Sequence, residues 1–174
     1  PEEAKKCIGY LPELPPLYMD MTVREYLNFV AELKKLDKKE RKHLIDEAME
    51  TTKISELQNR LIQNLSKGYR QRVGFAQAIL GYPEIIILDE PTVGLDPKQI
   101  IEIRELIREL GKKHTVILSS HILTEVSAVC DYVFILSKGK LVASDTTENL
   151  LNEMSGAQEI SLLVEGEKER AMSA

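Results

Sequence analysis

The chain has 174 residues, and its hydrophobic content of 43% is enough for one sizeable folded core. Charged residues make up 29% and the formal net charge is −5, which argues against a general nucleic-acid binder because such a protein needs a basic face. No apolar run approaches the ~20 residues of a membrane-spanning helix, so we expect any membrane association to come through a partner.

The first part of the chain predicts a short strand followed by helices. Residues 8–16 have the pattern of a strand that runs into a proline-rich loop. Thr22 and Glu25 match a capping box, because a hydroxyl and a carboxylate at this spacing can each accept from the other residue's backbone N–H. Asp37 and Glu40 repeat the spacing. Each pair therefore predicts a helix start before an apolar stripe.

A third helix is expected to begin at Ser66, whose hydroxyl can cap it, and to run to about Leu80. Gly81 and Pro83 would end this helix. Residues 20–82 therefore predict an all-helical insert.

Beyond Pro83, strands and helices alternate. Continuous aliphatic runs predict strands buried on both faces of a parallel sheet, and Asp96-Pro97 marks the start of the helix between them. This alternation indicates an α/β fold with its sheet core over about residues 83–143. The predicted elements are strands over 85–88 and 115–119, helices over 97–111 and 123–129, strands over 132–136 and 141–143 around a Lys138-Gly139 turn, a further strand over 159–165 and a helix start over 168–173.

Asp89 and Glu90 directly follow the strand predicted over residues 85–88. Active groups of open parallel sheets gather at the carboxyl ends of the strands. Phosphoryl transfer needs a carboxylate that holds Mg²⁺ and a second group that orients the attacking water. The acidic pair is therefore a candidate catalytic site, and a purely structural helix cap is the alternative.

Two further motifs accompany this pair. Residues 65–72 read Leu-Ser-Lys-Gly-Tyr-Arg-Gln-Arg, and residues 94–96 read Gly-Leu-Asp. Residues 65–72, the acidic pair and residues 94–96 follow one another along the chain. Motifs in this order resemble the nucleotide-binding subunit of ABC transporters, and the resemblance covers residues 1–156. The resemblance implies a P-loop NTPase (RecA-like) parallel sheet core with an inserted all-helical ABC subdomain, and ATP and Mg²⁺ as cofactors. Residues 157–174 would then start an accessory C-terminal domain.

The resemblance also assigns roles near the acidic pair. It implies that Asp89 binds Mg²⁺, that Glu90 orients the attacking water, and that His121 is the switch histidine that touches the γ-phosphate. Glu13 stands where the family normally has glutamine, between Mg²⁺ and the membrane subunit. An ordinary surface histidine and a proline loop without a partner are the alternatives for His121 and Glu13.

The signature loop of the family corresponds to Ser66, Lys67, Gly68 and Tyr69, which the resemblance implies contact ATP held by the other subunit. A helix N-terminus of this kind favours an anion. The common form of the loop is Leu-Ser-Gly-Gly-Gln, so Lys67 replaces a glycine and Tyr69 replaces the glutamine. Asp96 matches the loop that crosses the dimer interface, and it can also cap its own helix. For residues 66–69, the alternative is an ordinary capped helix without a ligand.

No G-x-x-x-x-G-K-S/T phosphate loop occurs in the chain, and Gly111-Lys112-Lys113 lacks both the first glycine and the final hydroxyl. We therefore expect a fragment that begins after the phosphate loop of its parent. Such a fragment is expected to be inactive alone.

The resemblance implies an ATPase subunit at the cytoplasmic face of the cell membrane. Its expected partners are a second nucleotide-binding subunit, as a homodimer or heterodimer, and a transmembrane permease, with no nucleic acid. Residues 10–13 and 22–27 resemble the branch that exports drugs, antibiotics and sodium. A soluble ABC ATPase acting on ribosomes or DNA stays open as the alternative. A binding-only cassette is disfavoured because Glu90 and His121 are both present.

Overall fold

The structure, a computed structural model, describes residues 2–150. The chain divides into two compact units, residues 1–130 and 131–174. The strand predicted over 159–165 and the helix start over 168–173 lie outside the described residues. The predicted domain division at residue 156 therefore stays a prediction.

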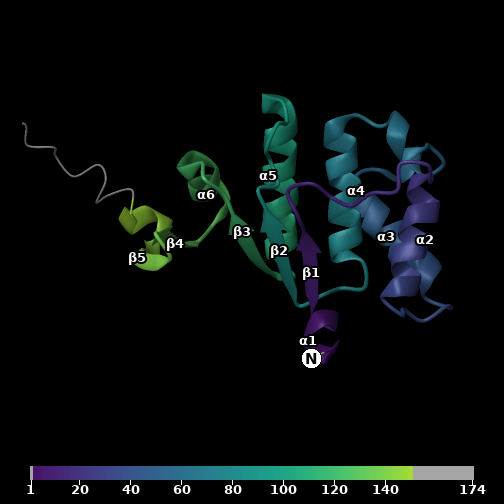
Figure 1. The fold of residues 1–174 in the computed structure, drawn as a ribbon, viewed down its shortest axis with the longest axis horizontal. Coiled ribbons are helices and arrows are strands. Elements are labelled where there is room, and N and C mark those ends of the chain that lie inside the picture. Colours follow the sequence, from purple (N-terminus) through teal and green to yellow (C-terminus); the bar gives the residue numbers. More distant parts are fainter. Residues whose placement is uncertain (1, 151–174) are drawn as a thin grey trace, which may run out of the picture. The chain divides into compact units, whose positions relative to one another are not determined.

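The first unit is built on a parallel sheet with the strand order β1-β2-β3 (Figure 1). In the register of the sheet, Leu11 lies beside Leu88, and Asp89 lies beside Ser119. Parallel neighbours need crossover connections, which the helices between the strands provide. This arrangement confirms the predicted α/β fold class. The elements are β1 Ile8–Leu11, β2 Ile85–Asp89 and β3 Thr115–Ser119, with α1 Glu2–Lys6 before the sheet and α6 Leu123–Val129 after it.

One face of the sheet carries the core. The side chains of Leu11, Ile86 and Leu88 are buried and belong to the core that α4 (Lys67–Ile79) and α5 (Pro97–Gly111) help to build. On the opposite face, Ile117 of β3 is 52% exposed. The prediction that β3 is buried on both faces is therefore wrong. Side chains alternate between the faces of a strand, and the described helices cover only one of them.

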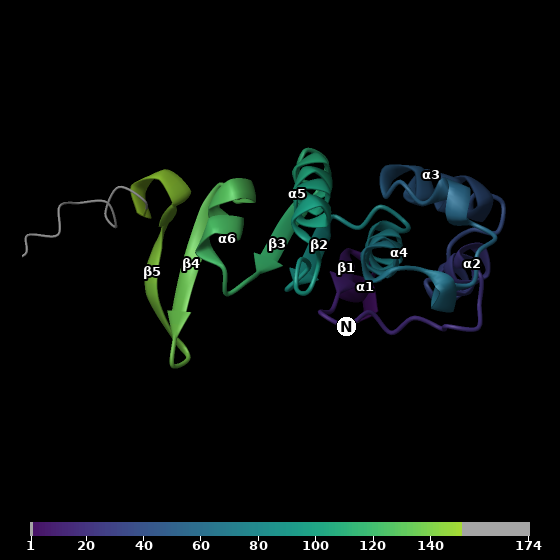
Figure 2. The ribbon, with the colours of Figure 1, turned by 90° about the horizontal axis from the view of Figure 1, so that it is seen from above.

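The segment between β1 and β2 is helical, as predicted (Figures 1 and 2). Thr22 and Glu25 form both bonds of the capping box at the start of α2. Asp37 does not repeat this role, because the next helix begins later and has no side-chain cap. The carboxylate of Asp37 instead accepts from the backbone N–H of Lys39 at 2.7 Å, within the preceding turn. The elements are α2 Val23–Leu33, α3 Arg41–Thr51, η1 Ser55–Leu57, η2 Ile62–Asn64 and α4.

Side chains form hydrogen bonds with backbone groups at both ends of helix α4. The hydroxyl of Ser66 accepts from the backbone N–H of Tyr69 at the N-terminus, as predicted. At the other end, the ammonium group of Lys34 donates to the carbonyl oxygens of Gln77 and Leu80 at 2.8 and 2.7 Å. Burial lowers the pKa of Lys34 to about 8. These contacts replace hydrogen bonds that the helix itself cannot make at its ends.

In the described part of the second unit, β4 (Tyr132–Ser137) and β5 (Lys140–Thr146) form an antiparallel hairpin. Lys138 and Gly139 both have positive φ angles, of 50° and 74°, as a tight hairpin turn requires. The strands and the turn form where they were predicted, but the two strands pair with each other in a sheet of their own. Among the described residues, the parallel sheet therefore ends at β3 and does not extend to residue 143 as predicted. Among residues 2–150, none of the helices combines the length and the apolar character needed to cross a bilayer.

Candidate functional site

Asp89 ends strand β2 and is held from both neighbouring strands. Its Oδ1 atom accepts from the hydroxyl of Ser119 on β3 at 2.5 Å. Its Oδ2 atom accepts from the hydroxyl of Tyr10 on β1 at 3.4 Å. Because the strands are parallel, their carboxyl ends meet at one edge, and the carboxylate is oriented there by a donor from each side.

Glu90, the next residue, has a φ of 46°, in the left-handed region that non-glycine residues seldom adopt. Its backbone is held on both sides. The N–H of Glu90 donates to the carbonyl of Ser119 at 3.1 Å, and its own carbonyl accepts from the N–H of Val93 at 3.2 Å. The chain therefore turns sharply at the end of β2, and the surroundings hold that turn.

The side chain of Glu90 contacts His121, with 2.8 Å between Oε1 and Nδ1. This hydrogen bond, followed by the negative charge of Glu90, raises the pKa of His121, and desolvation opposes the rise. The charges of Glu125 and Glu13 add to the rise. The two residues that the sequence associates with water orientation and with the switch are thus direct neighbours.

The second carboxylate oxygen of Glu90, Oε2, is buried and has no hydrogen-bond partner among the described residues. A buried carboxylate oxygen is an acceptor that calls for a donor. A water molecule is a suitable donor for this atom. The exposed residue Glu13, in the loop after β1, acts on the same site through its charge on His121.

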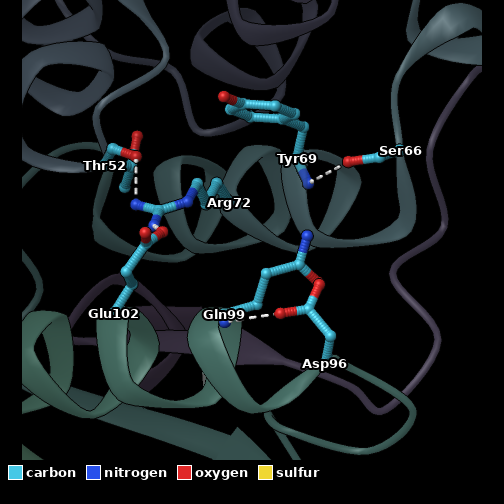
Figure 3. A network of polar contacts seen from close by, with 7 residues as sticks. All are labelled: Thr52, Ser66, Tyr69, Arg72, Asp96, Gln99 and Glu102. Carbon is cyan, nitrogen blue, oxygen red and sulfur yellow. Dashed lines mark hydrogen bonds and ion pairs between the residues drawn. The ribbon is translucent and has the colours of Figure 1, made fainter.

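The predicted signature loop forms the N-terminus of α4. Ser66 is the N-cap, with 3.4 Å between its hydroxyl and the backbone nitrogen of Tyr69 (Figure 3). Lys67, Gly68 and Tyr69 occupy the first turn, where backbone N–H groups and the helix dipole favour an anion. Tyr69 is 43% exposed. The loop thus offers both backbone donors and an accessible side chain.

The start of α5 lies against this loop. The carboxylate of Asp96 caps α5 by accepting from the backbone N–H of Gln99 at 3.0 Å (Figure 3). A Cβ atom at Gly68 would lie 2.5 Å from the side-chain amide of Gln99, and one at Gly94 would lie 2.1 Å from the ammonium nitrogen of Lys67. An open depression of about 500 Å³ is lined by residues of both segments, Asp96 and Tyr69 among them.

The predicted site residues therefore fall into two groups. Asp89, Glu90 and His121 meet at the carboxyl edge of the sheet, whereas residues 66–69 and Asp96 meet where α4 and α5 begin. Within residues 2–150, no hydrogen bond or ion pair joins a predicted residue of one group directly to one of the other.

Four buried polar residues near the two groups were not predicted. Gln71 donates from its side-chain amide to the carbonyl of Pro91 at 3.0 Å. Arg72 contacts the backbone of Thr52, just after α3, and the side chain of Glu102 on α5. Glu125 on α6 accepts from the hydroxyl of Thr92. For Gln71 and Arg72 the available signal was a run of three consecutive polar residues, 70–72, inside a predicted helix; Thr92 and Glu125 carry no such signal.

The fit to a metal ion depends on Asp89. No group of three or more His, Cys, Asp or Glu side chains that could hold a metal ion is found in the part of the chain that the structure describes. Mg²⁺ in nucleotide sites is commonly bound by one or two carboxylates together with phosphate oxygens and water. One oriented carboxylate, which Asp89 provides, fits this kind of ion.

Comparison with known proteins shows to which family the chain belongs. The profile of the ABC transporter family matches residues 1–93. The bacitracin transport ATP-binding protein BcrA of Bacillus licheniformis is 41% identical over 81% of this chain and 46% of its own length. The linearmycin resistance ATP-binding protein LnrL of Bacillus subtilis is 33% identical over 99% of this chain and 56% of its own length. The chain thus spans about half the length of these relatives.

A solved structure of CbiO1 from Clostridium perfringens, part of the ABC transporter complex CbiONQ, superposes with a TM-score of 0.81. It is 30% identical, and the match covers 88% of this chain and 62% of that protein. The chain therefore has the α/β fold of P-loop NTPases, with a helical segment inserted between β1 and β2. It belongs to the ABC transporter family of ATP-binding domains.

Proposed function

We propose that this chain is part of an ATP-binding and ATP-hydrolysing subunit that powers transport across a membrane through a partner permease. The contact between Glu90 and His121 carries the proposal. It joins a carboxylate with one uncommitted buried oxygen to an imidazole whose pKa is raised by that carboxylate. Such a pair can orient a water molecule and sense a phosphate at the same place.

In this proposal, Asp89 would hold Mg²⁺, which would supply positive charge to offset the negative charge of the phosphates. Tyr10 and Ser119 support the role by orienting the carboxylate of Asp89. Glu90 accepts a hydrogen bond from the attacking water through Oε2, and His121 contacts the γ-phosphate. Glu13 would help to hold the ion at the same site by accepting a hydrogen bond from water.

Residues 66–69 are proposed to contact the γ-phosphate of ATP held by a second subunit, which is a second copy of this chain or a related one. The backbone donors at the N-terminus of α4 support this role. Asp96 lies beside them and is proposed to cross the same interface. Lys67 adds a positive charge that a phosphate would attract.

The direction of transport is proposed as export, with the subunit on the cytoplasmic face of the membrane. The relatives named for bacitracin transport and linearmycin resistance support this direction. Their names give no support to the alternative of an ATPase acting on ribosomes or DNA. The exposed loop with Leu14 and Tyr18, 77% and 49% exposed, is proposed to face the permease.

The test uses a full-length subunit that contains these residues together with a phosphate loop. Glu90→Gln is expected to reduce ATP turnover at least about 100-fold, because the water loses its acceptor carboxylate, while ATP-dependent dimerisation persists. The matched control is Glu84→Gln, at the opposite end of β2, which should leave turnover unchanged. Turnover by Glu90→Gln at the wild-type rate would refute the proposal.

A further inference from the structure

Helix α4 carries two consecutive polar side chains that are almost fully buried. Gln71 is 5% exposed and Arg72 is 6% exposed. Burying an amide or a guanidinium costs free energy unless its polar atoms are hydrogen-bonded. The partners of these two side chains therefore show what the helix is attached to.

Arg72 attaches α4 to two other helices (Figure 3). Its Nη1 atom donates to the carbonyl of Thr52, just after α3, at 3.1 Å, and its Nη2 atom contacts the carboxylate of Glu102 on α5 at 2.5 Å. A guanidinium held on two sides in this way restricts both the rotation and the shift of the helix.

Gln71 attaches the same helix to the loop after β2. Its Nε2 atom donates to the carbonyl of Pro91 at 3.0 Å, in a buried bond between residues 20 positions apart. Pro91 directly follows Glu90, whose left-handed backbone needs support from its surroundings. The other bonds to the Glu90 backbone come from Ser119 and Val93. Gln71 therefore provides the hydrogen bond by which α4 holds the loop next to Glu90.

We propose that Gln71 is a positioning residue, which fixes the position of the loop after β2, with Glu90, relative to the N-terminus of α4. This inference rests on the proposed role of Glu90. Residues 66–69 lie one turn before Gln71 on the same helix, so a contact made by that N-terminus displaces the Pro91 carbonyl and, with it, the backbone of Glu90. The bond thus connects phosphate contact by the loop to orientation of the catalytic water within one chain.

The experiment measures ATP turnover in the full-length subunit with Gln71→Leu, which keeps the size of the side chain but removes the donor. The expected result is a kcat lowered about tenfold with the KM for ATP within about twofold of wild type, because the side chain of Gln71 is buried and its amide is bonded to the carbonyl of Pro91. Gln77→Leu is the matched control: it lies on the same helix and loses a hydrogen bond to Tyr26, but it does not contact the loop. Its kcat should stay at the wild-type value.

Gln71→Glu provides a second readout. An ionised carboxylate cannot donate to the Pro91 carbonyl, whereas a protonated carboxyl group can, and burial raises the pKa of such a group. The kcat of this variant, relative to wild type, is therefore expected to recover as the pH is lowered from about 8 to about 6. Because a buried ionised carboxylate also destabilises the fold, the urea-unfolding midpoint of the variant is measured at each pH, and only kcat values from conditions in which the variant is fully folded are compared. If Gln71→Leu fails to fold, the pH profile of Gln71→Glu decides alone.

Glu90→Gln in the same subunit separates the two proposals. If it abolishes turnover while Gln71→Leu keeps the wild-type kcat, or while Gln71→Glu shows no relative pH dependence, the positioning role is wrong and the proposed function stands. An equal loss of kcat in Gln77→Leu also overturns the positioning role. If Glu90→Gln retains turnover, the proposed function itself is wrong.

Discussion

The Nδ1 atom of His121 lies 2.8 Å from the Oε1 atom of Glu90, although the two residues are 31 positions apart. Neighbouring parallel strands bring them together, because β2 ends at Asp89 and β3 ends at Ser119, its partner in the register. The carboxylate is 20% exposed, whereas the imidazole is 70% exposed. The pair therefore consists of a largely buried carboxylate and an accessible imidazole, which suits contact with a ligand that arrives from solvent.

The first prediction concerns the pKa of His121. Glu90 raises this pKa in the folded chain, so the contact stabilises the fold fully below the unfolded value of 6.5, and the stabilisation is lost as the pH rises through the higher folded value. Glu90→Gln should lower the pKa of His121, as measured by an NMR titration of the imidazole. Glu84→Gln should leave it raised, and an equal effect of both substitutions would contradict the assignment.

A second prediction concerns Gly94, which has a φ of 69° in the loop before α5. Gly94→Ala is expected to destabilise the fold by about 1–2 kcal/mol, because a side chain is strained in the left-handed region. The ammonium of Lys67 must also move, since it lies where the new Cβ would be. Urea unfolding measures the difference.

Gly111 is the matched control for this substitution. It lies at the end of α5 and has open space around a Cβ. Gly111→Ala should therefore leave stability unchanged or raise it by about 0.5–1 kcal/mol. Similar destabilisation by the two alanines would show that backbone strain at Gly94 is not the cause.

Asp96 provides a third prediction, because its carboxylate caps α5 in addition to its proposed place at the interface. Asp96→Ala should cost about 1 kcal/mol in thermal or urea unfolding, since the N–H of Gln99 loses its partner. Asp96→Ser keeps a capping oxygen and should retain most of the stability. If serine is as destabilising as alanine, the capping role is secondary.

The fourth prediction is that the 174-residue chain alone does not bind ATP with micromolar affinity. Its sequence has no phosphate loop, whose backbone N–H groups and lysine hold the phosphates. Isothermal titration calorimetry with Mg-ATP should show no saturable heat. The full-length subunit with a phosphate loop is the positive control, and saturable micromolar binding by the chain would contradict the prediction.

The local elements were predictable where a short-range rule decides them. Thr22 with Glu25, Ser66, and Asp96 with Pro97 all cap helices as expected, because a cap depends on residues within one turn. The rule failed at Asp37, where a turn intervenes before α3 and the carboxylate is used in that turn. Capping boxes are reliable only when the helix begins directly at the first residue of the pair.

Burial was less predictable than the elements. An aliphatic run such as residues 115–119 is compatible with a strand covered on one face or on both, because composition does not say how many layers surround a sheet. In the described residues, α4 and α5 cover one face, and Ile117 remains half exposed on the other.

The sequence by itself determined the order of strands and helices, the capped helix starts and the positions of the candidate site residues, because these depend on neighbours along the chain. Only the tertiary structure decided which distant residues meet. The contact of Glu90 with His121, and the bond from Gln71 to the Pro91 carbonyl, depend on strand order and helix packing. No periodicity encodes those pairings, because they arise only when the parallel strands align and α4 docks on the sheet.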